Sequence, residues 1–115
     1  MNIKELVLGV MWFTIAHIVV WFQLNGQFLW PWFRKNEWIV ASSGAVISFF
    51  YIWGTKHGVA AFDGLLWPNR FLGFSIGILI YGFMVYLFMG ESINLKTAVS
   101  LILCCAVIAI QILWK

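Results

Sequence analysis

The chain has 115 residues, of which 63% are hydrophobic and 10% are charged, and its net charge is +3. Soluble domains carry about 25% charged and about 45–50% apolar residues, and a core of this size cannot hold the surplus of apolar side chains. A separate soluble catalytic domain is therefore excluded, and we expect lipid to surround most of the chain. The lysines and arginines are scattered and form no basic block, so no nucleic-acid partner is expected.

Four long apolar segments follow one another along the chain. Each has about 17 to 20 residues, close to the roughly 20 that a helix needs to cross a bilayer. The runs are unbroken and lack the alternating pattern of an outer-membrane barrel. The sequence therefore predicts an all-α integral membrane protein, a four-helix bundle forming one membrane domain over residues 1–115, with spans at residues 6–24, 38–55, 71–89 and 97–113.

Interfacial residues separate these spans. Residues 30–35 place two tryptophans and a proline beside two cations, a composition typical of the headgroup region. Residues 56–70 hold glycines, a histidine and charged residues around two short apolar pieces. We expect this second segment to form an interfacial turn or a short surface helix, with Pro68 at or just before the first turn of the third span.

The charges at the two ends of the bundle orient it only weakly. With four spans both termini share one side, and four of the seven cations lie on that side and three on the other: Lys4, Lys56, Arg70 and Lys115 against Arg34, Lys35 and Lys96. The positive-inside rule gains little from such a difference. Two interpretations remain open: a single orientation with cytoplasmic termini in an inner, cytoplasmic-type membrane, or dual insertion that yields an antiparallel homodimer.

Small residues indicate where helices pack against each other. Helices in lipid associate where small side chains let their backbones approach, and the third span contains a Gly-x-x-x-Gly motif. The predicted packing positions are Gly44 in the second span, Gly73, Gly77 and Gly82 in the third, and Cys105 and Ala109 in the fourth.

His17 is the clearest polar residue deep in a predicted span, about two thirds of the way along the first one. It shares a helical face with Thr14 and Trp21, so a neighbouring helix or cavity would meet a hydroxyl, an imidazole and an indole. Histidine transfers protons near neutral pH and an aromatic face attracts cations, which suits a proton-coupled carrier of organic cations. Trp12 and Tyr81 are candidates to line the same cavity. The alternative is a neutral, structural His17 that is hydrogen-bonded to a serine or tyrosine of another span.

No pattern in the sequence predicts a cofactor or an enzymatic activity. The two histidines are far apart in sequence and the two cysteines are adjacent, so no metal-ligand spacing is present. No nucleophile elbow, phosphate loop or dinucleotide fingerprint occurs either. All four acidic residues fall at or outside the ends of the spans. We therefore expect neither a cofactor nor an enzyme.

The C-terminal half resembles a known transporter group. The run from Phe88 to Ala98 (FMGESINLKTA), with a hairpin turn at Gly90 and Glu91, resembles the last hairpin of a four-helix unit of the drug/metabolite transporter superfamily. More loosely, residues 73–78 resemble the third helix of the small multidrug resistance proteins. The resemblance implies a four-helix fold, a homodimer and transport of small solutes. The first-helix glutamate of that group has no counterpart here, where His17 is the only ionisable residue at depth.

Three functions follow from these features. The leading hypothesis is a small transporter of the drug/metabolite type that moves a small solute, cationic or aromatic in character, as a homodimer. The second is a structural or accessory subunit that packs on a larger membrane partner. The third is a dual-topology ion channel of similar size.

Overall fold

The computed structural model describes residues 1–114, and within them every regular element is helical. Four helical stretches are long and apolar enough to cross a membrane, which confirms the predicted all-α class and identifies an integral, multi-pass membrane protein. Lys115, counted above among the cations, lies outside the described residues. The elements are α1 (Ile3–Asn25), η1 (Gly26–Phe28), α2 (Pro31–Lys35), α3 (Glu37–Ser42), α4 (Gly44–Ala61), α5 (Leu66–Met89) and α6 (Leu95–Leu113).

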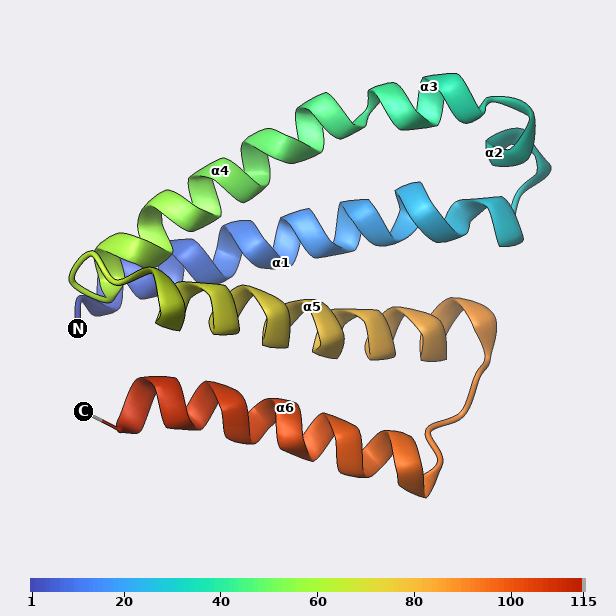
Figure 1. Cartoon of the computed structure of the whole chain (residues 1–115). Helices are drawn as coiled ribbons and strands as arrows, with labels where there is room; N and C mark the ends of the chain where they lie inside the picture. The colour runs from blue at the N-terminus through green and yellow to red at the C-terminus, as the bar shows by residue number, and fades with distance from the viewer. Residues whose placement is uncertain (115) are drawn as a thin grey trace.

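Helix α1 lies between α4 and α5, whereas α6 packs mainly on α5 (Figure 1). The start of α1 and the end of α6 lie at the same end of the bundle, as an even number of spans requires. The short helix α2 and the connection between α5 and α6 lie at the opposite end. The first helix of the chain is thus the centre of the packed part.

Glycines allow α1 and α4 to approach closely. A Cβ atom on Gly9 would lie 3.0 Å from the backbone nitrogen of Gly58, and one on Gly54 would lie 2.9 Å from the ring of Phe13. Phe13 itself is buried and also faces Gly73 of α5. Because helices in lipid gain little from hydrophobicity, this close packing is a main source of their association.

The first turns of two long helices are capped by asparagines. The side chain of Asn2 accepts a hydrogen bond from the backbone nitrogen of Glu5, and Asn94 accepts one from Thr97. These bonds satisfy donors that have no partner within the helix.

The predicted turn at Gly90 and Glu91 leads from α5 to α6. Gly90 ends α5 in the left-handed region, with φ of 67°, which a residue without Cβ adopts at no steric cost. Residues 90–94 then connect to the start of α6.

The predicted turn is present and Pro68 lies in the first turn of the next helix, as predicted, but the connection is much shorter than residues 56–70. Helix α4 continues through Ala61 and α5 already begins at Leu66, so only residues 62–65 form the connection. Gly58, one of the two glycines that suggested an interruption, lies inside α4 and packs against α1, whereas Gly64 lies in the turn with φ of 87°. Pro68 is tolerated because it lies in the first turn of α5, where backbone N–H groups have no helical acceptor to lose.

A break between α3 and α4 interrupts the second membrane-spanning stretch at Ser43. The hydroxyl groups of Ser42 and Ser43 donate to backbone oxygens of their own helix, at 2.7 and 2.5 Å. Gln23 of α1 donates to the backbone oxygen of Val40 and to the hydroxyl of Ser43. Gln23 therefore ties α1 to this break.

Candidate functional site

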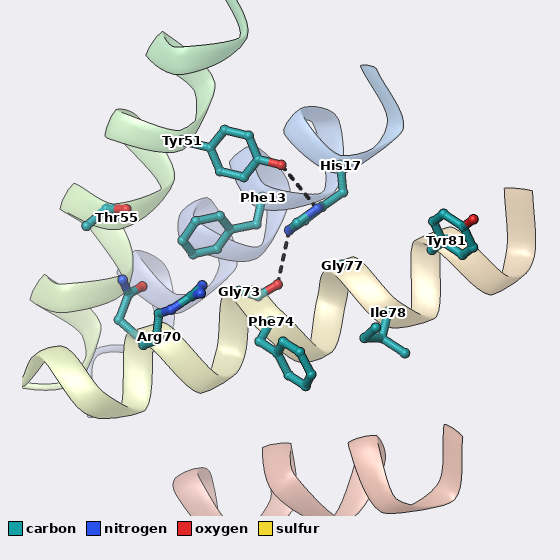
Figure 2. A pocket seen from close by; sticks show the side chains of 11 residues that line it. Phe13, His17, Tyr51, Thr55, Arg70, Gly73, Phe74, Gly77, Ile78 and Tyr81 are labelled. Carbon is teal, nitrogen blue, oxygen red and sulfur yellow. Dashed lines mark hydrogen bonds between the residues drawn. The ribbon is translucent and has the colours of Figure 1, made fainter. Parts of the chain in front are cut away.

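His17 joins three helices. Its Nε2 atom lies 3.0 Å from the backbone oxygen of Gly73 in α5, and its Nδ1 atom lies 3.2 Å from the hydroxyl of Tyr51 in α4 (Figure 2). A carbonyl can only accept, so Nε2 carries the proton, and in the neutral ring Nδ1 then accepts from the tyrosine. The neutral imidazole therefore uses both of its nitrogens. This is the arrangement that the structural alternative for His17 anticipated.

The Gly-x-x-x-Gly motif of α5 provides the space for this ring. A Cβ atom on Gly77 would lie 2.6 Å from Cε1 of His17, closer than side-chain carbons approach. Gly73 contributes the accepting carbonyl and also faces the ring of Phe13. The motif therefore serves the contact between α5 and α1.

A cavity of about 350 Å³ adjoins His17 between α1, α4 and α5. This volume is at the small end of the range of ligand sites. Glycines leave the cavity open near its centre, and side chains divide it into a polar and an apolar part. The polar part consists of His17, Tyr51, Thr55, Asn69 and Arg70, and the apolar part of Phe13, Phe74, Ile78 and the ring of Tyr81.

Only two of the five predicted site residues meet at this cavity, namely His17 and Tyr81. The hydroxyl of Thr14 donates to the backbone oxygen of Val10 in its own helix. Thr14 lies one turn before His17, but its side chain takes no part in the contacts that His17 makes with α4 and α5.

The two predicted tryptophans lie in other aromatic clusters. Trp12 packs against Trp53 and Phe50 of α4, with ring centroids 4.8 and 5.9 Å apart. Trp21 is 2% exposed and packs against Phe88 of α5, and its indole nitrogen has no hydrogen-bond partner within residues 1–114. The predicted site residues of α1 do lie in one helix, but successive turns of that helix pack against different neighbours, so the two tryptophans do not reach the cavity.

The remaining small residues fall into two groups. Gly82 faces Leu101 of α6, and Gly44 faces the side-chain amide of Gln23, so both lie at helix contacts. Cys105 and Ala109 of α6 are exposed within the monomer. Their predicted packing role stays a prediction, because no helix of the described chain covers them.

Four polar residues of the cavity were not among the predicted site residues. Tyr51 and Thr55 are one turn apart on α4, while Asn69 and Arg70 lie at the start of α5. A signal was present, because Asn69 lies one turn before Gly73 on the same helical face. It was missed because residues 56–70 were expected to lie outside the helices.

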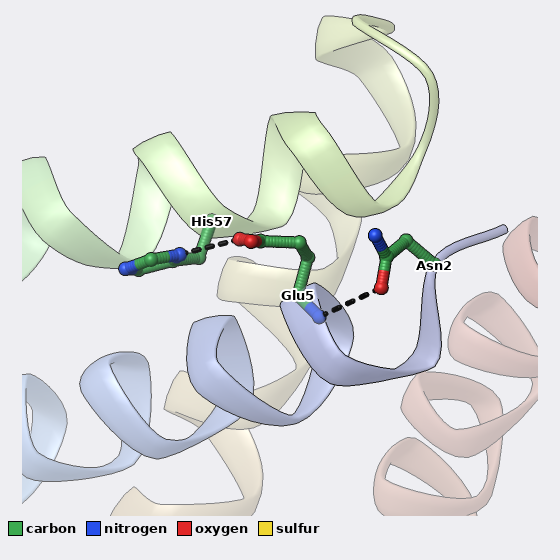
Figure 3. A network of polar contacts seen from close by, with 3 residues as sticks. All are labelled: Asn2, Glu5 and His57. Atoms are coloured by element: carbon green, nitrogen blue, oxygen red, sulfur yellow. Dashed lines mark hydrogen bonds and ion pairs between the residues drawn. The ribbon is translucent and has the colours of Figure 1, made fainter.

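A second polar contact ties the end of α4 to the start of α1. Nδ1 of His57 lies 2.5 Å from a carboxylate oxygen of Glu5, whose backbone nitrogen donates to Asn2 (Figure 3). The backbone nitrogen of Asn2 in turn donates to the oxygen of Ala61. Within residues 1–114 this is also the one ion pair that the structure contains, and no group of three potential metal ligands occurs there.

No protein-family model, curated protein or solved structure matches this chain.

Proposed function

We propose that the protein is a small membrane transporter that binds its solute in the cavity between α1, α4 and α5. The observation that carries the proposal is this cavity, within a helix bundle long and apolar enough to span the membrane, with His17 at its wall. An accessory subunit has no need of such a space. The resemblance of residues 88–98 to the drug/metabolite transporters supports the same function.

His17 is the proposed coupling group. In its neutral form it accepts a hydrogen bond from Tyr51 and donates one to the backbone oxygen of Gly73, so it links α4, α1 and α5. Protonation places a hydrogen on Nδ1 and removes the acceptor that Tyr51 uses. The link between α1 and α4 then has to rearrange, which connects proton binding to helix movement.

The apolar wall of the cavity supports an aromatic solute. Phe13, Phe74 and Tyr81 present ring surfaces to the space, and aromatic rings gain about 0.5–1.5 kcal/mol from such pairing beyond the area they bury.

The experiment is uptake into vesicles that contain the purified protein, driven by a pH gradient. Two permanently charged aromatic probes, benzenesulfonate and benzyltrimethylammonium, cross lipid slowly on their own. We expect uptake of at least one probe to exceed that of protein-free vesicles and to fall at least tenfold in His17→Ala. His57→Ala is the matched control, because that histidine lies outside the cavity, and it should keep the native rate. Uptake of neither probe above the background of empty vesicles would refute the transporter.

We further propose that a second copy of the chain covers α6. This helix packs mainly on α5 and has no buried residue within the described chain. Oxidative cross-linking in membranes tests the dimer: native protein and Cys104→Ala should form a disulfide-linked dimer through the exposed Cys105, and Cys105→Ala should not. Recovery of α6 cross-linked to a different protein of fixed stoichiometry would favour the accessory subunit instead.

A further inference from the structure

The cavity wall carries one permanent positive charge and no carboxylate. The cation is Arg70, whose side chain extends from the start of α5 towards Phe13 (Figure 2). Within residues 1–114 no acidic side chain lies within ion-pairing distance of its guanidinium. The carboxylate of Glu5 is paired with His57. The guanidinium is thus left without a partner from the described chain.

Asn69, beside Arg70, is 6% exposed and makes no hydrogen bond within residues 1–114. Its Oδ1 atom is buried against Gly58, so the amino group is what the amide can offer to the cavity. Thr55 adds a hydroxyl to the same end of the cavity.

These groups share one chemistry, since a guanidinium and an amide nitrogen are donors. Arg70 is exposed, and its guanidinium can bind an oxyanion through two parallel hydrogen bonds that its charge strengthens. The positive end of the α5 helix dipole lies near the same residues and acts in the same direction. An organic cation would meet repulsion here, with no acid to compensate it.

We infer that the solute is an organic anion, a carboxylate or sulfonate with an aromatic or aliphatic body. The oxyanion binds at Arg70 and Asn69, and the body lies between Phe13 and Phe74. This inference rests on the proposed transport function and names its substrate class. It replaces the cationic solute that the His17 face suggested with one of opposite charge.

A lipid headgroup offers the same chemistry. Arg70 lies near the end of a membrane-spanning helix, and arginine side chains there reach towards phosphates. Arg70 is exposed, so a free solute and a lipid headgroup can both reach it. The test includes an arm for each source.

Binding of the two aromatic probes is measured by calorimetry with the protein in phosphatidylcholine nanodiscs. We expect benzenesulfonate to bind at least tenfold more tightly than benzyltrimethylammonium. Arg70→Gln should weaken benzenesulfonate binding at least tenfold, as loss of one charge-assisted hydrogen bond predicts. Arg70→Lys keeps the charge but loses the paired donors, so its affinity for benzenesulfonate should lie between those of the native protein and Arg70→Gln.

Lys35→Gln is the matched control. It removes the same charge from an exposed position at the other end of the bundle, outside the cavity, and should leave benzenesulfonate binding unchanged. A loss of affinity equal to that of Arg70→Gln would attribute the effect to net charge and overturn the inference. Tighter binding of the cationic probe, or no binding of either, would overturn it as well.

The lipid arm repeats the titration in nanodiscs that contain phosphatidylglycerol. A free-solute site should lose less than twofold in affinity for benzenesulfonate. Complete competition by the anionic lipid, abolished in Arg70→Gln, would assign the cavity to a headgroup and refute the solute.

The uptake assay separates this inference from the transport function. If benzyltrimethylammonium alone is taken up, the transport function is supported and the inference of an anionic solute is refuted. If benzenesulfonate binds tightly and depends on Arg70 but is not taken up, the anion site is supported and the transport function is refuted.

Discussion

Helices α1, α4 and α5 are held together differently from α6. The first three contact each other through glycines and contribute every buried apolar side chain that lies within a helix of the described chain. Side-chain hydrogen bonds join α1 to α4 through Tyr51 and His57, and to α5 through Gly73. Helix α6 has no buried residue, and the side-chain hydrogen bonds of its region, such as that from Ser100 to Lys96, stay within its own turns.

The difference shows what packing in lipid requires. All four helices are apolar, so apolar character does not determine which of them pack closely. Close contact follows where one helix presents glycine and another presents a ring or a polar group that fits. Substitutions can therefore be chosen that act on one half of the molecule and leave the other unchanged.

The largest effect is expected from Gly9→Leu. A Cβ atom there already meets the backbone of Gly58 at 3.0 Å, and backbone cannot turn aside as a side chain can. We expect the free energy of unfolding to fall by about 3 kcal/mol or more, through overpacking that separates α1 from α4. The measurement is SDS-induced unfolding in mixed micelles. Val7→Leu, an exposed position on the same helix, is the control, and equal losses for both would contradict the close contact.

His17→Ala should have the next largest effect. It removes two hydrogen bonds between helices, each worth about 0.6 kcal/mol in membrane proteins, together with the packing of the ring on Gly77. We expect unfolding to become easier by about 2 kcal/mol. Thr14→Ala loses a bond within its own helix and should change stability by less than about 0.5 kcal/mol. A similar loss in both variants would argue against the link between helices.

Tyr51→Phe removes one hydroxyl and keeps the ring. We expect a loss of about 0.6 kcal/mol, and none when the same change is made in His17→Ala, because the partner is then already absent. This double-mutant cycle isolates the bond between Tyr51 and His17. Additive losses would show that the hydroxyl acts elsewhere.

Gly82→Ala tests the other half and should have the smallest effect. A Cβ atom there meets the side chain of Leu101 at 3.7 Å, an ordinary contact. We expect stability to stay within about 0.5 kcal/mol of the native value, since a better helix former replaces glycine without a clash. Gly77→Ala is the comparison within the same helix, and it should be the more damaging because of His17. Equal effects would remove the distinction between the two faces of α5.

The membrane-spanning pattern of the fold could be predicted from the sequence because it depends on composition and run length alone. The extent of the second and third helices could not, since glycine reads as a helix breaker in a soluble protein. In lipid, a helix that loses backbone hydrogen bonds has no water to replace them, so Gly58 remains helical and becomes a contact.

The candidate site could be predicted only in part. His17 and Tyr81 were identifiable because a polar or phenolic group deep in an apolar run is rare. Arg70 and Asn69 were not, because their place in the cavity depends on where α5 begins and on which helix lies opposite. Which helices pack against each other is decided between segments far apart in the sequence. The same pairing decides that Trp12 and Trp21 contact other neighbours than His17 does.

The central place of α1 has a consequence for how the protein is made. The first helix leaves the ribosome before either of its partners, and at about 5–20 residues per second roughly 3 to 12 s pass before α5 is complete. During that interval the imidazole of His17 sits in lipid without Tyr51 or Gly73. Membrane insertion is therefore most vulnerable before the second half of the chain arrives, and a nascent chain arrested there is the form that quality control has to recognise.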